Sequence, residues 1–200
     1  PALALTDYSN MYGTIEFFST CKKEGIKPII GVEFTIYSNE RRFKIVLLVK
    51  DLAGYKNLMR ITSLVNIDNP VDPVLTDDIL INHKDGLIVL SGGLWGDVSN
   101  LLVIDEKLAL SRLDFYKKYF PDSYYLEINP QTNVDNSQDM RSKTITLARS
   151  TNTPLVATWN THYLHTQDKP AKKILYLVNG EENSLEEYNH LFQKDTFAFE

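Results

Sequence analysis

The sequence predicts an α/β fold with a parallel sheet, and three observations carry that prediction. Short apolar runs alternate with segments of helical periodicity along almost the whole chain, which favours parallel strands joined by crossover helices. The strand runs are almost continuously apolar, as expected when both faces of a sheet are covered. No glycine-rich phosphate turn follows an early strand. A (β/α) barrel, or a closed barrel-like sheet, therefore fits better than a doubly wound sheet.

The first unit is predicted to run strand, helix, strand. Residues 2–6 form a short apolar run that is typical of a buried strand, and residues 26–33 form the next one. Gly25 ends the helix between them, because a residue in the left-handed conformation is needed at that point. The apolar residues at helical spacing in this helix are Met11, Ile15 and Phe18.

The rest of the chain repeats this alternation. Apolar runs predict further strands at 42–50, 86–90, 124–128 and 154–158. Helical patterns predict helices at 54–65, 76–81, 96–103, 106–119, 137–150 and 168–178. Thr76 is a helix cap, residues 38–40 form a surface turn, and Pro70 and Pro73 place a loop at 66–74. No shift in composition marks a boundary, so residues 1–200 are expected to form a single domain.

Bulk properties exclude several classes of protein. A net charge of −5 argues against a surface built mainly to grip phosphate backbones. The single cysteine, Cys21, gives no disulfide framework and fits a reducing compartment, so a cytoplasmic location is expected. No apolar run approaches the ~18 residues of a membrane span, so no membrane partner is expected. Pro1 leads straight into a strand, which indicates a fragment of a longer protein.

Polar residues follow the ends of the predicted strands, where barrels of this kind place their chemistry. They are Asp7, Glu33, Ser91, Glu127, Asn129, Gln131, Asn160 and His162. Carboxylates and an imidazole on one rim suit zinc, manganese or iron, but amides carry no charge and ligate such metals weakly. Three of these residues also have structural explanations: a helix cap for Asp7, a solvated strand end for Glu33 and a hydrogen-bonded histidine for His162.

Six segments resemble one known family. They are PALALTDYSNMYGTIEF, GIKPIIGVEF, LLVKDLAGYKNLMRITS, GLIVLSGG, YYLEI and PLVATWNTHYL. They occur in the family's order over nearly the whole chain, and this chain resembles the N-terminal PHP (polymerase and histidinol phosphatase) domain of bacterial DNA polymerase III α subunits. The resemblance implies a distorted (β/α)7 barrel. It also implies that the barrel's first strand lies before Pro1 and is missing here, and that palm, thumb and fingers follow beyond residue 200.

The resemblance also implies which residues remain of the family's metal site. PHP domains that bind metal use histidines and acids at this rim, often around three metals. The residues that match this pattern are Asp7, Glu33 and His162. The positions where family ligands are lost are Tyr8, Gln131 and Asn160. A trinuclear cluster is not expected, because the remaining acids cannot balance three cations.

Three functions follow from the resemblance. The first is a non-catalytic barrel in a DNA-directed DNA polymerase, a nucleotidyltransferase of DNA replication, which supports the polymerase core and docks the proofreading exonuclease subunit. In this reading the fragment has no catalytic residue and no cofactor, and the parent polymerase contacts DNA and uses Mg²⁺ elsewhere. The second is a metal-dependent phosphoesterase, a 3′–5′ exonuclease or pyrophosphatase, with weakly bound Zn²⁺ or Mn²⁺. The third, a free-standing sugar- or amino-acid-phosphate phosphatase, fits the GYKNLM and SGG segments least.

Overall fold

A seven-stranded sheet organises the computed structural model, which describes residues 1–130, 136–178 and 198–199. The strands are β1 (Ala2–Tyr8), β2 (Lys27–Ser38), β3 (Arg41–Val49), β4 (Val74–Leu75), β5 (Leu87–Leu90), β6 (Tyr124–Ile128) and β7 (Leu155–Ala157). The helices are α1 (Thr14–Lys23), α2 (Leu52–Asp68), α3 (Asp77–Asn82), α4 (Asp97–Ile104), α5 (Glu106–Tyr119), α6 (Ser137–Thr151) and α7 (Lys169–Val178). Two short 3₁₀ turns are η1 (Gly93–Trp95) and η2 (Thr166–Asp168).

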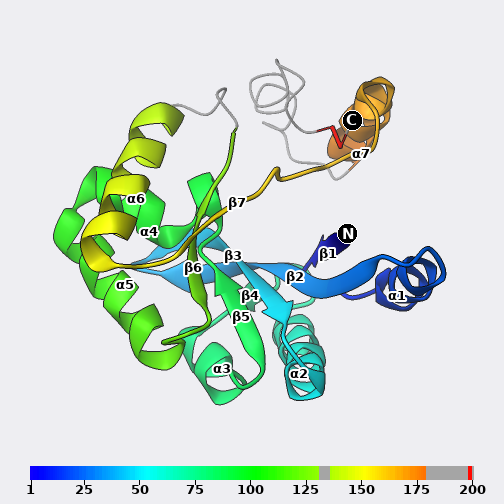
Figure 1. Cartoon of the computed structure of the whole chain (residues 1–200), viewed down its shortest axis with the longest axis horizontal. Helices are drawn as coiled ribbons and strands as arrows, with labels where there is room; N and C mark the ends of the chain where they lie inside the picture. Colours follow the sequence, from blue (N-terminus) through cyan, green and yellow to red (C-terminus); the bar gives the residue numbers. More distant parts are fainter. Residues whose placement is uncertain (131–135, 179–197, 200) are drawn as a thin grey trace.

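The sheet is curled and open, with strand order β1-β2-β3-β5-β6-β7 and β4 beside β2. Helices α1 to α6 lie around its outside (Figure 1). Among the described residues, β1 and β7 form the two edges and each pairs on one side only. The α/β class and the barrel-like sheet are thus confirmed, and the open half-barrel fits a distorted barrel that lacks a strand. No helix within the described ranges is long and apolar enough to cross a membrane.

The expectation of parallel pairing is wrong for β3, which runs antiparallel to both β2 and β5. A two-residue turn at Asn39 and Glu40 joins β2 to β3, and both residues have positive φ values of 49° and 60°. Two left-handed residues match the twist of flanking antiparallel strands, so this turn produces a hairpin instead of a crossover. The remaining pairs, β1–β2, β2–β4, β5–β6 and β6–β7, are parallel.

Two of the helices predicted in the N-terminal half differ from those in the structure. The helix expected at 54–65 starts earlier and ends later, because Asp51 caps it by accepting a 2.9 Å hydrogen bond from the Gly54 amide. In α1 the predicted apolar face does not enter the core: Ile15 is 70% exposed and Phe18 is 42% exposed. Helix α1 packs mainly against β2 and also contacts the edge strand β1, and no element among the described residues covers its outer side.

The hydrophobic core lies between the outer face of the sheet and the helices. Its fully buried side chains come from β2, β3, α2, α3 and α5 and include Phe34, Ile36, Ile45, Leu47, Leu58, Ile61, Leu80, Leu113 and Tyr116. Side chains alternate along a strand, so the residues between these core positions face the inside of the half-barrel. That inner face carries Glu33 and Thr35 of β2 and Lys44 of β3.

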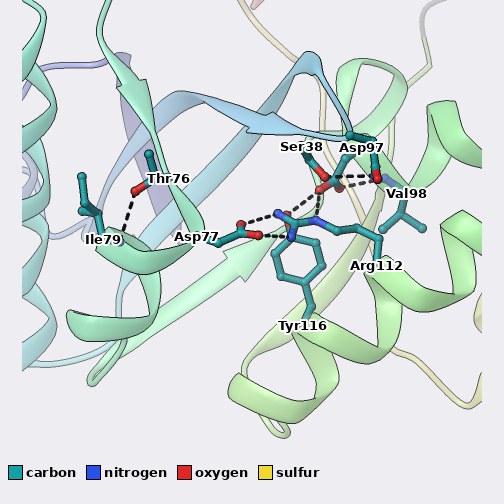
Figure 2. Close-up of polar contacts among 9 residues, drawn as sticks. Ser38, Thr76, Asp77, Ile79, Asp97, Val98, Arg112 and Tyr116 are labelled. Carbon is teal, nitrogen blue, oxygen red and sulfur yellow. Dashed lines mark hydrogen bonds and ion pairs between the residues drawn. The ribbon is translucent and has the colours of Figure 1, made fainter.

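Behind the sheet, a buried ion-pair cluster joins three helices, as Figure 2 shows. The guanidinium of Arg112 in α5 donates through Nε to Asp97 at 2.5 Å, and through Nη1 and Nη2 to Asp77 at 2.6 and 2.7 Å. Arg112 Nη2 also donates to the Tyr116 hydroxyl at 2.8 Å, which donates to Asp97 at 2.7 Å. Because the polar groups in this cluster bond one another, it fixes the starts of α3 and α4 against α5.

Candidate functional site

Four side chains meet on the inner face of β1, β2 and β3, and we call them the rim cluster: Tyr8, Glu33, Thr35 and Lys44. Tyr8 lies opposite Glu33 in the parallel β1–β2 register, and Thr35 lies opposite Lys44 in the hairpin. The Lys44 ammonium is 2.9 Å from Glu33 Oε1 and 3.9 Å from the centroid of the Tyr8 ring. The Tyr8 hydroxyl lies 2.6 Å from Thr35 Oγ1. A cation, an acid and an aromatic ring thus form one connected group.

Asp7 is not part of this cluster. Its partner in β2 is Val32, which is fully buried in the core on the outer face. Asp7 Oδ2 lies 3.2 Å from the position that a Cβ would take on Gly13, which begins the turn into α1. Strand β1 extends through Tyr8, two residues beyond the predicted run, and alternation along it places Asp7 and Tyr8 on opposite faces. The structure therefore does not bring Asp7 together with Glu33.

Glu127 of β6 is a buried acid at the same end of the sheet, and 6% of its surface is exposed. Its Oε2 accepts a 3.0 Å hydrogen bond from the Gly92 amide, and its Oε1 accepts one from the Thr158 hydroxyl. Burial raises the pKa of Glu127, the Thr158 hydrogen bond opposes that shift, and the negative charge of Glu33 adds to it. Both carboxylate oxygens are engaged by the protein itself, which reduces their value as metal ligands.

The SGG segment after β5 forms the turn that holds these groups. Gly92 and Gly93 have φ values of 79° and 56°, a region that L side chains rarely adopt. A Cβ on Gly93 would lie 1.6 Å from Asn129 Oδ1, which accepts a 3.0 Å hydrogen bond from the Leu94 amide. Asn129 Nδ2 donates to the Thr158 hydroxyl at 2.8 Å. Asn129 therefore bridges the turn to the chain beyond β7, which is a structural role.

His162 lies near the rim cluster, after β7. The residue is exposed overall, yet desolvation of the imidazole and the positive charge of Lys172 lower its pKa to about 4. The charges of Glu33 and Lys44 act on the same pKa in opposite directions, which places His162 within electrostatic range of both. Asn160 has a left-handed φ of 53° in the loop before it. Gln131 lies outside the described residues.

These residues do not fit a divalent metal ion. In the described parts of the chain, no three His, Cys, Asp or Glu side chains form a group that could hold one. The Lys44 ammonium contacts the carboxylate of Glu33, where its charge repels a second cation. The register places Asp7 on the other face of the sheet, and the Tyr8 hydroxyl lies 2.6 Å from Thr35 Oγ1.

Sequence reasoning missed Lys44. The signal was present in the turn at Asn39 and Glu40, because a two-residue hairpin fixes the register of the strands that it joins. Counting back from that turn pairs Thr35 with Lys44 and places Lys44 on the same face as Glu33.

Comparison with known proteins gives a consistent result. The PHP domain family model matches residues 1–131. The DNA polymerase III subunit alpha of Buchnera aphidicola (subsp. Acyrthosiphon pisum) is 38% identical over 90% of this chain, and that of Vibrio cholerae is 37% identical over 79%. The corresponding subunit of Treponema pallidum is 32% identical over 98% of this chain.

The chain spans only 16%, 14% and 18% of the lengths of these three relatives. Among solved structures, a protein from Bifidobacterium adolescentis described as a metal-dependent phosphoesterase aligns over 79% of this chain and 76% of its own. Its TM-score of 0.35 and 13% identity carry no argument about this chain. The family model covers more than half of the sequence, and the chain belongs to the PHP domain family.

Proposed function

We propose that residues 1–200 form the single PHP domain of a bacterial DNA polymerase III α subunit, where it acts as a non-catalytic barrel. In this role the domain supports the polymerase core and docks the proofreading exonuclease subunit, and it works in the cytoplasm, where the chromosome is replicated. Three relatives named as this subunit are 32–38% identical over 79–98% of the chain, and they support the proposed identity of the parent protein. In such a parent, the Mg²⁺ ions and the contacts to DNA belong to other domains.

The observation that carries the non-catalytic role is the ion pair of Lys44 with Glu33. Metal-dependent phosphoester hydrolysis needs an ion that generates hydroxide and orients the phosphate. At this rim the best-placed acid, Glu33, already holds an ammonium group at 2.9 Å, and the buried Glu127 accepts hydrogen bonds from Gly92 and Thr158. No residue of the rim cluster is left as a nucleophile or a metal-bound base.

A metal-dependent phosphoesterase that uses Asp7, Glu33 and His162 is the competing function. Its requirement is that these three groups share one ion. Glu33 and His162 lie within electrostatic range of each other, but Asp7 faces the opposite side of β1. The competing function would therefore need a rearrangement of β1, which has no support in the register of the sheet.

The test uses the complete polymerase chain that contains this domain. Binding to its exonuclease subunit is measured by size-exclusion chromatography, and hydrolysis of a 3′-terminal nucleotide or of pyrophosphate is measured with added Mn²⁺ or Zn²⁺. The proposal expects a stable complex and no hydrolysis above the level of the His162→Ala variant. Hydrolysis that depends on metal and disappears in His162→Ala would establish the phosphoesterase instead. Lack of any complex would contradict the docking role.

A further inference from the structure

We propose that the exposed side of α2, from Leu52 to Ile67, is a docking surface for an acidic amphipathic helix of another protein. We call this surface the α2 face. It contains a hollow of about 500 Å³ beside the end of α3. The residues that line the hollow are Lys56, Met59, Arg60, Ser63, Leu64 and His83. The inference goes beyond the proposed function, and it holds whether or not the rim cluster binds a metal ion.

The α2 face carries more apolar surface than the outer side of a core-covering helix usually does. The side of α2 that enters the core is marked by buried Leu58, Ile61 and Val65. The opposite side carries large apolar residues that are 36–77% exposed, namely Leu52, Met59, Leu64 and Ile67. A helix that only covers a core presents charged and polar residues to the solvent. A run of apolar side chains along its outer side therefore indicates a surface that a partner covers.

Two cations lie among these apolar residues without a carboxylate partner. Lys56 and Arg60 are one helical turn apart, so their side chains are neighbours and their charges repel each other. Within the described parts of the chain, neither forms an ion pair with an Asp or Glu, and Arg60 Nη1 donates only a long hydrogen bond of 3.5 Å to Asn57 Oδ1. The chain as a whole has a net charge of −5, so this positive pair is a local feature.

The hollow is held in shape by contacts between α2 and the segment that follows α3. Asn57 Nδ2 donates to the Asp85 carbonyl at 2.8 Å, which ties the middle of α2 to the chain before β5. The His83 ring donates from Nδ1 to the Ile79 carbonyl at 2.9 Å, which fixes the ring at the edge of the hollow. A surface that is already ordered loses less conformational entropy when a partner docks on it.

The charges of the α2 face argue against a second copy of this chain as its occupant. An interface between two identical copies with two-fold symmetry pairs the same surface patch with itself. Arg60 lies near the middle of the α2 face, so antiparallel docking of two such faces would bring the Arg60 side chains of both copies together. Nucleic acid would pair with the two cations but would leave Met59 and Leu64 uncovered, and phosphate backbones are usually held by a larger set of cations.

An acidic amphipathic helix satisfies both features of the α2 face. Its carboxylates would pair with Lys56 and Arg60, and its apolar side would cover Met59 and Leu64 at the hollow, as in other complexes in which a helix lies in a groove. Helix α2 has 17 residues and is about 25 Å long, so it can accompany a docked helix of five turns or so along its whole length.

The experiment measures binding of a fluorescein-labelled peptide to the full 200-residue chain by fluorescence anisotropy. The probe is an alanine-based helix of about 20 residues, long enough to be helical in water, with leucines on one side and glutamates beside them. We expect saturable binding that weakens between about 50 mM and about 300 mM NaCl. Lys56→Glu combined with Arg60→Glu should weaken it by about tenfold or more, because two attractions become repulsions.

Two controls locate the binding. Lys107→Glu combined with Lys118→Glu makes the same change in net charge at exposed positions of α5, which lies away from α2 (Figure 1), and should change the affinity by about twofold or less. Met59→Asn tests the apolar contact without changing charge, and should weaken binding by about threefold or more. All these positions are exposed, so the melting temperature (Tm) of each variant should stay within about 2 °C of wild type.

Three results would overturn the inference. The first is no binding of the acidic helix by wild type, or binding that both double variants weaken equally. The second is binding of a labelled 20-base-pair DNA that needs Lys56 and Arg60 but is unaffected by Met59→Asn, which would make nucleic acid the occupant. The third is a dimer in analytical ultracentrifugation that Met59→Asn dissociates, which would make a second copy the occupant. None of these results bears on the proposed non-catalytic role.

Discussion

Two clusters in this molecule place a cation between carboxylates and aromatic rings, and they do so at different depths. In the helix-side cluster, the Arg112 side chain is 6% exposed and its partner Asp97 is 1% exposed. Its guanidinium carbon lies 4.4 Å from the centre of the Phe115 ring and 4.5 Å from that of Tyr116. In the rim cluster, the Lys44 side chain is 34% exposed and holds one carboxylate oxygen and one ring.

The difference indicates two different roles. The Arg112 guanidinium is itself buried and donates four hydrogen bonds, two of them to Asp77, whose side chain is 36% exposed, so it joins helices and leaves no position for a ligand. The Lys44 ammonium has one carboxylate partner at 2.9 Å, and the two side chains are 34% and 26% exposed, so solvent weakens this ion pair. Mutations should therefore lower stability strongly at the first cluster and less at the second.

The largest expected effect is at Arg112. Arg112→Met removes one partner of a buried ion-pair network and leaves Asp97 charged at 1% exposure, so the free energy of unfolding should fall by about 3–5 kcal/mol. Urea denaturation followed by circular dichroism measures the loss. Lys118→Met, an exposed lysine in the same helix, is the control and should cost about 0.5 kcal/mol or less. A loss below about 1 kcal/mol for Arg112→Met would refute the assigned structural role.

The next largest effect on stability is expected at the turn formed by Gly92 and Gly93. Gly93→Ala combines a φ of 56° with a Cβ only 1.6 Å from Asn129 Oδ1, and should lower the free energy of unfolding by about 2 kcal/mol or more. Gly25→Ala is the matched control, because its φ is 68° but nothing lies within 4 Å of the added Cβ. Its expected loss is about 1 kcal/mol, from backbone strain alone. Equal losses in the two variants would mean that the contact with Asn129 is not tight.

Glu127 gives a smaller effect with a defined dependence on pH. Its folded-state pKa is raised above 4.5, so the unfolded chain loses this proton first as pH rises. The contribution to stability is fully present below pH 4.5 and is lost as pH rises through the folded-state pKa. The Tm of Glu127→Gln relative to wild type should therefore be more favourable at about pH 8 than at about pH 4. Glu24→Gln controls for the loss of one charge, and an unchanged difference at the two pH values would contradict the assignment.

The smallest effect is expected at a surface pair that resembles the two clusters only in its chemistry. Arg42 donates to Asp72 at 2.7 and 2.5 Å, but the two side chains are 58% and 39% exposed. Exposed pairs of this kind contribute little after screening by salt. The change in Tm for Arg42→Met should be smaller than that for Lys44→Met in the same buffer. A larger change would mean that side-chain exposure does not predict which of these ion pairs contributes more to stability.

Much of the fold could be predicted from the sequence because local signals mark the element ends. The helix predicted at 106–119 is α5 with the same bounds, and Asp105 caps it by accepting from the Lys107 amide at 2.8 Å. The strand predicted at 124–128 is β6 with the same bounds. The direction of β3 could not be inferred from apolar runs, because it depends on two left-handed residues in a turn without glycine.

The site was harder to predict because the pairing register of the strands, and the alternation of side chains along each strand, decide which residues meet there. Glu33 was predicted as a rim residue and lies in the rim cluster. Asp7 was grouped with it because the strand end was placed two residues too early, and a small error in a strand end changes which face a side chain occupies. Lys44 sits in an apolar strand with no motif, and only the hairpin register brings it to Glu33. The metal roles of Asp7, Glu33 and His162 stay predictions.

The central claim is that this rim holds an ammonium group in place of a metal ion. Metal content by mass spectrometry, on the polymerase chain that contains this domain after dialysis against Zn²⁺ and Mn²⁺, tests it most directly. Isolating the domain region by limited proteolysis before the measurement separates its metal from that of the polymerase core. The account predicts less than about 0.1 metal ion per chain in this region. A stoichiometry of about one or more would contradict it and would make Glu33 and His162 ligands.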